Sequence, residues 1–472
     1  MDADFDAASA EVTTKNVAVL LATVSSFLSP FMVSSTNVAL PTIAAEFRMN
    51  AILLSWVPMV YIVAGAIFLL PLGKIADIYG RKKLFIYGIL TFSVSSGLSA
   101  MSNSGEMLIF FRAFQGIGAA MTFGTGVAIL MSVVPAPERG RALGLAIGSV
   151  YVGMSAGPFA GGFLTELLGW RSIFLASGLL AMATAVLTIC RLKGEWAQAK
   201  NERFDIFGSV IYCLILASVM YGFHLLPGTA GFFFLSAGVC GSFVFIKWER
   251  KIEHPVFDWE LFRHNRVFAL SNLALFINYG ATFAIAFLIS LYLQYIKHLG
   301  PQYAGVIMVS QPILQAAFSP YAGRLSDRVE PQIVASCGMG LTVIGLVLFV
   351  FLKETSSLWF IVGTLALHGL GFALFSSPNT KAAMGSVEPR LYGVASGIVS
   401  TMRLMGNYLS IGIAMFIFSI YIGQVRITSE NYGAFLMSIR VIFVVFACLC
   451  LGGVFASLAR GKSAAEPVSS RE

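Results

Sequence analysis

Long apolar stretches separated by short polar loops recur along the whole chain. A helix needs roughly 20 predominantly apolar residues to cross a bilayer. Segments of this kind are predicted at 17–40, 52–72, 83–101, 107–131, 141–165, 171–190, 206–224, 231–248, 267–296, 303–321, 332–352, 357–376, 391–421 and 434–458. The seventh and eighth are separated only by residues 226–230, where a Pro-Gly pair favours a turn. The pattern therefore predicts an all-α membrane protein with fourteen transmembrane helices.

The composition favours burial in a bilayer over burial in a soluble core. Of the 472 residues, 57% are hydrophobic and 11% are charged, whereas soluble domains are about 45–50% apolar and about 25% charged. The six cysteines show no metal-ligand spacing, so we expect neither a metal site nor a disulfide. The first sixteen residues are polar and acidic, unlike the basic start of a cleavable signal, so we expect the first apolar segment to remain as a helix.

Basic residues are distributed unevenly between alternate loops. Fourteen spans place both termini on one side of the membrane, and 23 of the 31 Lys and Arg residues fall on that side. Five fall on the other side, and Arg112, Arg403 and Arg440 fall within spans. Because cytoplasmic loops carry the excess of basic residues, we expect a multi-pass protein of the cell membrane with both termini in the cytoplasm. The same distribution removes nucleic acid as the reason for the net charge of +8.

Two loops resemble each other at the scale of half the chain. Gly73 precedes Asp77 by four residues after the second span, and Gly323 precedes Asp327 by four residues after the tenth. Many membrane folds are built from two such repeats. We therefore expect a six-helix bundle in residues 1–190, two inserted helices in residues 191–266, and a second six-helix bundle in residues 267–472. The end of the inserted region, 249–266, is predicted to be an amphipathic connector at the cytoplasmic membrane surface.

Four motifs together resemble those of the major facilitator superfamily. They are the loop 73–83, the stretch 112–120 in the fourth span, the stretch 153–162 in the fifth span, and residues 37–41 in the first. Over nearly the whole chain, the sequence is similar in particular to the fourteen-helix drug:proton antiporter branch, which contains multidrug-efflux proteins. The resemblance implies two six-helix bundles with two extra central helices. It also implies a secondary transporter that exports small organic molecules by alternating access, driven by an ion gradient, with the proton as the candidate ion. An organic-anion exchanger or importer of the same fold is the alternative.

Two positions depart from the family's motifs. Ile78 replaces a usual basic residue of the loop motif, and Met32 stands where the first-helix motif of the branch usually carries an aspartate. The resemblance therefore does not carry over the branch's acidic membrane residue, and the coupling ion stays open.

Small and charged residues of the repeated loops are the gating candidates. They are Gly73, Asp77, Gly80, Arg81 and Asp327. An aspartate at a helix end can cap a helix N-terminus and pair with an arginine. The resemblance implies that such a cluster locks the two halves together and then releases them. A topology signal alone is the simpler interpretation of the same charges.

The fifth span carries a face of small residues at four-residue spacing. Gly153, Gly157 and Gly161 would let a neighbouring helix approach closely, and Pro158 would bend the span. We expect this close, bent contact to seal the two halves against leakage, with ordinary helix packing as the alternative.

Polar residues predicted at membrane depth are the candidates for the transport path. They are Asn37, Arg112, Gln115, Gln311, Gln315, His368 and Arg403. A charge at this depth is costly and normally faces a cavity or a partner. The resemblance marks Arg112, Gln115 and Arg403, while Gln311 and Gln315 share one predicted helix face. His368 is either a buried neutral histidine or a proton relay, and Arg440 is expected to extend to the membrane surface.

Other functional classes fit the sequence less well. We find no nucleophile–base pair, metal-ligand cluster or phosphate-binding loop, so neither an enzyme nor a cofactor is expected. The expected partners are a small-molecule substrate and the lipid bilayer, with the protein acting as a monomer. No Asp or Glu falls in the central portion of a predicted span. This absence favours neutral or anionic compounds over cationic ones.

Overall fold

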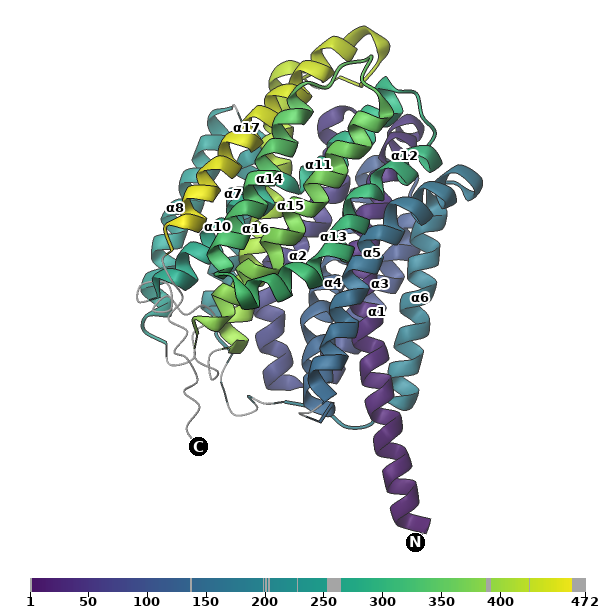
Figure 1. The fold of residues 1–472 in the computed structure, drawn as a ribbon. Coiled ribbons are helices and arrows are strands. Elements are labelled where there is room, and N and C mark those ends of the chain that lie inside the picture. The colour runs from purple at the N-terminus through teal and green to yellow at the C-terminus, as the bar shows by residue number, and fades with distance from the viewer. Residues whose placement is uncertain are drawn as a thin grey trace.

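The computed structural model describes residues 2–135, 138–197, 199, 202, 204–226, 228–252, 265–387, 392–423 and 425–460. Within these residues the chain is helical and contains no strand (Figure 1). The elements are α1 (Asp2–Phe47), α2 (Ala51–Tyr79), α3 (Arg81–Ala100), α4 (Gly105–Val133), α5 (Arg139–Leu168), α6 (Arg171–Arg191), α7 (Ile206–Leu225), α8 (Thr229–Glu249), α10 (Arg266–Thr282), α11 (Ala284–Leu291), η2 (Tyr292–Ile296), α12 (Pro301–Met308), α13 (Ser310–Arg328), α14 (Pro331–Val350), α15 (Leu358–Gly385), α16 (Tyr392–Tyr421), η4 (Ser429–Asn431) and α17 (Tyr432–Leu458).

Thirteen helices of the described chain are long and apolar enough to cross a membrane. The difference from the fourteen predicted spans lies at the tenth, which the chain builds as two shorter helices, α12 and α13. They meet at Val309, three residues before Pro312, which has no N–H to donate back along the helix. The ninth span is also interrupted, at Phe283 between α10 and α11. The predicted all-α membrane architecture is confirmed.

The first six helices pack mainly on one another, and so do the helices from α10 to α17. In the first group the largest contacts join α1 to α5 and α3 to α4; in the second, α14 packs on α15 and α13 on α15. We term these two groups the first half and the second half. Figure 1 shows α1 beginning and α17 ending at the same end of the bundle.

The inserted pair, α7 and α8, lies beside both halves at the edge where α2 meets α16. The Tyr212 hydroxyl on α7 donates to the Ala66 carbonyl of α2 at 3.3 Å. The Tyr408 hydroxyl on α16 donates to the Met220 carbonyl of α7. Since α7 is bonded to one helix of each half, the pair bridges them at this edge. The predicted connector 249–266 lies largely outside the described residues.

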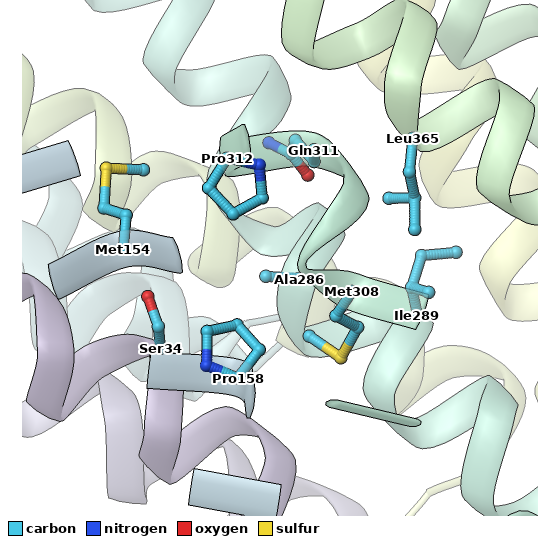
Figure 2. A pocket seen from close by; sticks show the side chains of 9 residues that line it. All are labelled: Ser34, Met154, Pro158, Ala286, Ile289, Met308, Gln311, Pro312 and Leu365. Carbon is cyan, nitrogen blue, oxygen red and sulfur yellow. The ribbon is translucent and has the colours of Figure 1, made fainter. Parts of the chain in front are cut away.

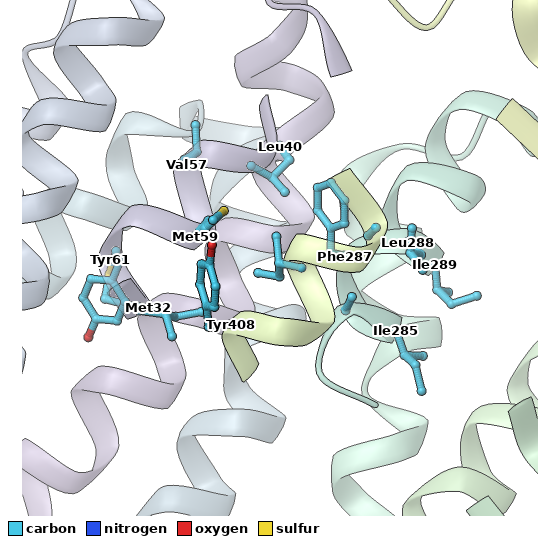
Figure 3. Packing of buried hydrophobic residues seen from close by; sticks show 14 of the residues in the cluster. Met32, Leu40, Val57, Met59, Tyr61, Ile285, Phe287, Leu288, Ile289 and Tyr408 are labelled. Atoms are coloured by element: carbon cyan, nitrogen blue, oxygen red, sulfur yellow. The ribbon is translucent and has the colours of Figure 1, made fainter. Parts of the chain in front are cut away.

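Apolar side chains fill the interior where the helices cross, and Met32 is among them. Met32 is fully buried in α1, in one cluster with Leu40, Val57 and Tyr408 (Figure 3). A carboxylate at this position would be surrounded by hydrocarbon and would be costly to ionise. The site that is acidic in the resembling branch is therefore part of the packed core in this chain.

Candidate functional site

The two ends of the bundle carry different residues. We term the end that bears the loop between α2 and α3 the basic end, because Lys74, Arg81, Lys82 and Lys83 lie there. The other end is termed the opposite end. The site described here is the interface between the two halves, from one end to the other.

Polar side chains of the second half bind the backbone of α1 toward the opposite end. The Ser290 hydroxyl on α11 donates to the Asn37 carbonyl at 2.6 Å. The Gln294 amide in η2 donates to the Val38 carbonyl at 2.8 Å. Asn37 and Val38 are buried. These bonds join the two halves through main-chain acceptors.

Glycines allow α5 and α12 to touch backbone to backbone. A Cβ on Gly162 would lie 2.5 Å from the Pro301 carbonyl oxygen, and a Cβ on Gly305 would overlap the Pro158 carbonyl. Small residues permit such close approach between membrane helices. The contact joins the first half to the second, so any larger side chain here would push the halves apart.

A carboxylate completes the same contact. Glu166 on α5 accepts a hydrogen bond from the backbone N–H of Gln302, at the start of α12, at 3.2 Å. The first N–H groups of a helix have no partner within the helix, and an anion is favoured there. The loops beyond add two bonds between the halves: Arg426 Nε donates to the Arg48 carbonyl at 3.1 Å, and the Ala51 N–H to the Val425 carbonyl at 3.3 Å.

Toward the basic end the interface opens into a cleft. At mid-depth the Tyr151 hydroxyl of α5 and the Ser319 hydroxyl of α13 are 2.9 Å apart. From there a cleft of about 370 Å³ runs between the two helices. It is lined by Gly144, Ile147, Gly148, Tyr151, Val152, Ala316, Ser319, Pro320, Gly323 and Ser377. Among the described residues, no hydrogen bond or ion pair joins the two halves at the basic end.

A smaller cavity of about 50 Å³ lies between the cleft and the opposite end. Figure 2 shows Ser34, Met154 and Pro158 on one side of it and Gln311, Pro312 and Leu365 on the other. Gln311, a predicted transport-path residue, therefore lies at the interface. Gln315, one turn further along α13, is buried, and its side-chain oxygen has no hydrogen-bond partner among the described residues.

Arg403 and Arg112, both predicted for the transport path, have different surroundings. Arg403 on α16 is half-buried, with its guanidinium carbon 5.4 Å from the ring centre of Tyr279. Arg112 on α4 is fully buried. Its Nε donates to the Val57 carbonyl at 3.1 Å, its Nη1 to Gln115 at 2.5 Å, and its guanidinium carbon lies 4.3 Å from the ring centre of Tyr61. Arg112 and Gln115 are thus bound inside the first half.

His368 is likewise inside a bundle. It is fully buried on α15, beside Gly345 of α14, and neither ring nitrogen has a hydrogen-bond partner among the described residues. It does not line either hollow between the halves. The proton-relay role remains a prediction.

The predicted gating residues form separate clusters, each within one half. Asp77 at the end of α2 accepts from Arg81 Nε at 2.8 Å, and Arg81 Nη1 donates to Ser132 of α4 at 2.9 Å. In the second half, Asp327 pairs with Lys381. Gly73 has open space where a Cβ would lie. Among the described residues, neither cluster is bonded across the two halves.

The segment after α6 packs on the α2–α3 loop. Glu195 accepts hydrogen bonds from the N–H groups of Lys82 and Lys83, at 2.8 and 3.2 Å, and so caps α3. The Arg81 N–H donates to the Trp196 carbonyl at 2.9 Å. Gly80 has φ of 122°, and a Cβ there would lie 2.5 Å from the Glu195 carboxyl carbon. The cap of α3 thus comes from Glu195 rather than from Asp77.

The glycine face of α5 contacts α1 of the same half. A Cβ on Gly153 would lie 2.6 Å from the Phe27 carbonyl, one on Gly157 would lie 2.5 Å from Ser34 Cβ, and one on Gly161 would lie 2.5 Å from Ser35 Cβ. The contact between the halves instead uses Gly162 and the carbonyl of Pro158. Whether the glycine face itself prevents leakage remains a prediction.

Several residues that shape the interface were not predicted from the sequence. They are Glu166, Ser290, Gln294, Gly162 and Gly305. Most of their partners are backbone atoms, which leave no trace in side-chain patterns. A buried arginine was also missed: Arg460 bonds to Asn379 at 2.6 Å and to Ser271 at 3.0 Å, and burial lowers its pKa to about 10. It stays charged near neutral pH.

The described residues contain no group of three or more His, Cys, Asp or Glu side chains placed to hold a metal ion. The polar side-chain groups that bond across the interface are hydroxyls, an amide, a carboxylate and a guanidinium. Such groups bind and orient a molecule.

Comparisons with known proteins identify relatives over nearly the whole chain. The model of the Major Facilitator Superfamily matches residues 22–274 and 271–472. The riboflavin transporter RibZ of Clostridioides difficile is 28% identical over 444 residues, which are 93% of this chain and 96% of that protein. The multidrug resistance protein Stp of Mycobacterium tuberculosis is 30% identical over 387 residues, 80% of this chain and 71% of that one. The crystal structure of the nucleoside transporter NupG, at 13% identity, superposes with a TM-score of 0.66 over 95% of this chain and all of that one, and so shares the fold.

Proposed function

Because this chain belongs to the Major Facilitator Superfamily, we propose that it exports small organic molecules across the cell membrane by alternating access, driven by an ion gradient. The candidate ion is the proton. In this proposal the basic end faces the cytoplasm, as the distribution of Lys and Arg predicts.

The asymmetry of the interface is the observation that carries the proposal. The halves are joined at the opposite end by main-chain bonds and a glycine contact, and separated at the basic end by a cleft of about 370 Å³. A carrier that rocks one half on the other needs such a state, with one end sealed and the other accessible. A substrate from the cytoplasm would enter the cleft, and the opposite seal would open after the basic end closes.

Similarity to multidrug resistance proteins supports export. A second candidate is the transport of a planar heterocycle in either direction. It is supported by similarity to a riboflavin transporter over 93% of this chain. The alternative to export given by the sequence is that the protein exchanges or imports an organic anion.

The test is vesicle transport with purified, reconstituted protein of known orientation. Fluorescent dyes, riboflavin and aromatic acids are offered on the basic side, with and without a pH gradient across the membrane. Proton-coupled export predicts accumulation that collapses when an ionophore removes the gradient. Accumulation in the reverse direction only would contradict export, and accumulation that ignores every ion gradient would contradict the coupling.

A variant sharpens the coupling test. His368→Ala removes the buried imidazole, and a role as proton relay predicts that gradient-driven accumulation is lost while downhill exchange persists. Unchanged gradient-driven transport would assign His368 to packing alone.

A further inference from the structure

Arg403 of α16 is a half-buried, charged side chain at mid-depth of the bundle, and no described residue is its polar partner. It makes no hydrogen bond or ion pair with any described residue, and its Nε is buried without an acceptor. Its guanidinium carbon lies over the face of the Tyr279 ring on α10, 5.4 Å from the ring centre. An uncompensated charge at this depth is costly, and such residues usually mark a substrate or ion path.

No carboxylate of the described chain neutralises this charge. The Asp and Glu residues lie at helix ends and in loops. Their ion pairs are made there, by residues such as Asp77 with Arg81 and Glu46 with Arg171. At Arg403 the bundle therefore carries a positive charge that an incoming anion can neutralise.

One aromatic ring, Tyr279, lies beside the guanidinium, and a second, Tyr151 of the first half, lines the cleft. Tyr151 of α5 lines the cleft and is near enough to Arg403 to interact with it electrostatically. Tyr279 packs edge-on against Phe372 of α15, with ring centres 5.1 Å apart. Rings of this kind offer flat apolar faces, and hydroxyls at their edges, to a planar molecule.

The other arginine of the predicted path cannot play this role. Arg112 is fully buried, donates to Val57 and Gln115, and lies on the Tyr61 ring within the first half. A molecule in the cleft would not reach it without disrupting that bundle. The structure thus separates two arginines that the sequence treats alike.

We propose that Arg403, Tyr151 and Tyr279 form the substrate site for a planar aromatic anion. A carboxylate of the substrate accepts hydrogen bonds from the Arg403 guanidinium, while its ring lies against the two tyrosines. This inference rests on the proposed function, because it names the class of substrate that the proposed transporter would carry.

Three probes that share a naphthalene ring system and differ in charge test the proposed substrate class. They are 2-naphthoate, 2-naphthamide and 2-naphthylmethylammonium, offered to purified protein in neutral-lipid vesicles, with equilibrium binding and transport measured for each. Naphthoate should bind tightest. Arg403→Gln should weaken naphthoate binding by roughly 10- to 100-fold, as expected for loss of a charged hydrogen bond, and change naphthamide binding by less than about threefold.

Controls separate charge from folding. Arg403→Lys keeps the charge and should retain part of the affinity. Arg440→Gln removes an arginine of the same half that donates to the Leu352 carbonyl near the opposite end, and should leave naphthoate binding unchanged. Each variant must keep the elution volume and melting temperature of the parent protein. Tyr279→Leu, which removes one ring face, should weaken naphthoate and naphthamide alike.

The outcomes are distinguishable. Equal or tighter binding of the ammonium probe, absence of naphthoate binding, or an Arg403→Gln variant that binds naphthoate normally would overturn the inference. Gradient-driven transport of the amide or the ammonium alone would overturn it and leave the proposed function standing. Competition by inorganic phosphate as strong as by naphthoate would show that charge alone is recognised, and would overturn the aromatic part.

Discussion

At the opposite end the two halves meet through main-chain atoms and glycines, whereas the described ion pairs at the basic end form within one half or the other. Gly305 lies against the Pro158 carbonyl, and Gln294 donates to the Val38 carbonyl. By contrast, Asp77 pairs with Arg81 in the first half and Asp327 with Lys381 in the second. Close backbone contact requires a fixed geometry, while charges on loops can exchange partners at small cost in water. The difference suggests a seal that is either made or lost at one end, and interchangeable ion pairs at the other.

The glycine contact of the seal offers the largest expected effect. Gly305→Leu places a side chain where even a Cβ would overlap the Pro158 carbonyl. Overpacking costs about 1–3 kcal/mol, so we expect the sealed state and the transport rate to fall by roughly 10- to 100-fold. The rate is measured in vesicles at equal protein level. Gly363→Leu is the matched control, because no atom lies within 4 Å of its Cβ position; equal rates in the two variants would refute the tight contact.

Gly157→Leu tests whether the contact inside the first half matters as much as the contact between the halves. Its Cβ would lie 2.5 Å from Ser34 Cβ on α1. We expect lost transport or an ion leak, with membrane insertion retained and a rate loss of about tenfold. Dye leakage and transport are recorded on the same vesicles. A full transport rate without leakage would show that the glycine face is not needed for the seal.

At the basic end, Asp77→Asn removes the negative member of its cluster. Arg81 would keep its hydrogen bond to Ser132 but lose its ion pair with the Asp77 carboxylate. If that charge is needed when the end closes, transport should fall by about tenfold while expression and melting temperature stay the same. A transport rate of the variant equal to that of the wild type, at equal protein level, would contradict the gating role of Asp77. Glu354→Gln at the opposite end is the control, because the Glu354 carboxylate forms no hydrogen bond or ion pair with a described residue.

Glu166→Ala tests the carboxylate that caps α12 across the interface. Losing a cap costs about 0.5–2 kcal/mol, so the seal should open more often, by roughly two- to thirtyfold. The measurement is the labelling of Ile289→Cys, in the small cavity, by an impermeant maleimide added from the opposite side, with the six native cysteines replaced. Glu106→Ala, an exposed acid at the same end, should leave labelling unchanged.

Glu195→Gln is expected to have the weakest effect. It should reduce access to the cleft from the basic end, whereas Glu166→Ala should increase access from the opposite end. The glutamine can still accept from Lys82 and Lys83, but it lacks the charge that favours the start of α3. A loss of about 0.3–1 kcal/mol should reduce labelling of Ala316→Cys in the cleft, from the basic side, by about two- to fivefold. Increased labelling would mean that the segment after α6 opposes opening of the basic end.

The sequence by itself determined the helices, their alternation and the family. A backbone in lipid must satisfy its own hydrogen bonds, so each long apolar stretch has one outcome, a helix. The motifs around Asp77, Arg112 and Gly157 stand at fixed places along those helices and could be read directly. The interruption of the tenth span is explained by one residue of the sequence, Pro312. The pattern of apolar residues alone did not predict that interruption.

Only the tertiary structure decided what surrounds each polar residue at membrane depth. Arg112, His368 and Arg403 look alike in the sequence, as single polar residues at membrane depth. Which way each one faces depends on how its helix is rotated against its neighbours, and packing sets that rotation. The seal escaped prediction because it is made of backbone carbonyls, which every residue carries. A side-chain pattern therefore cannot reveal that the Pro158 carbonyl meets Gly305 across the interface.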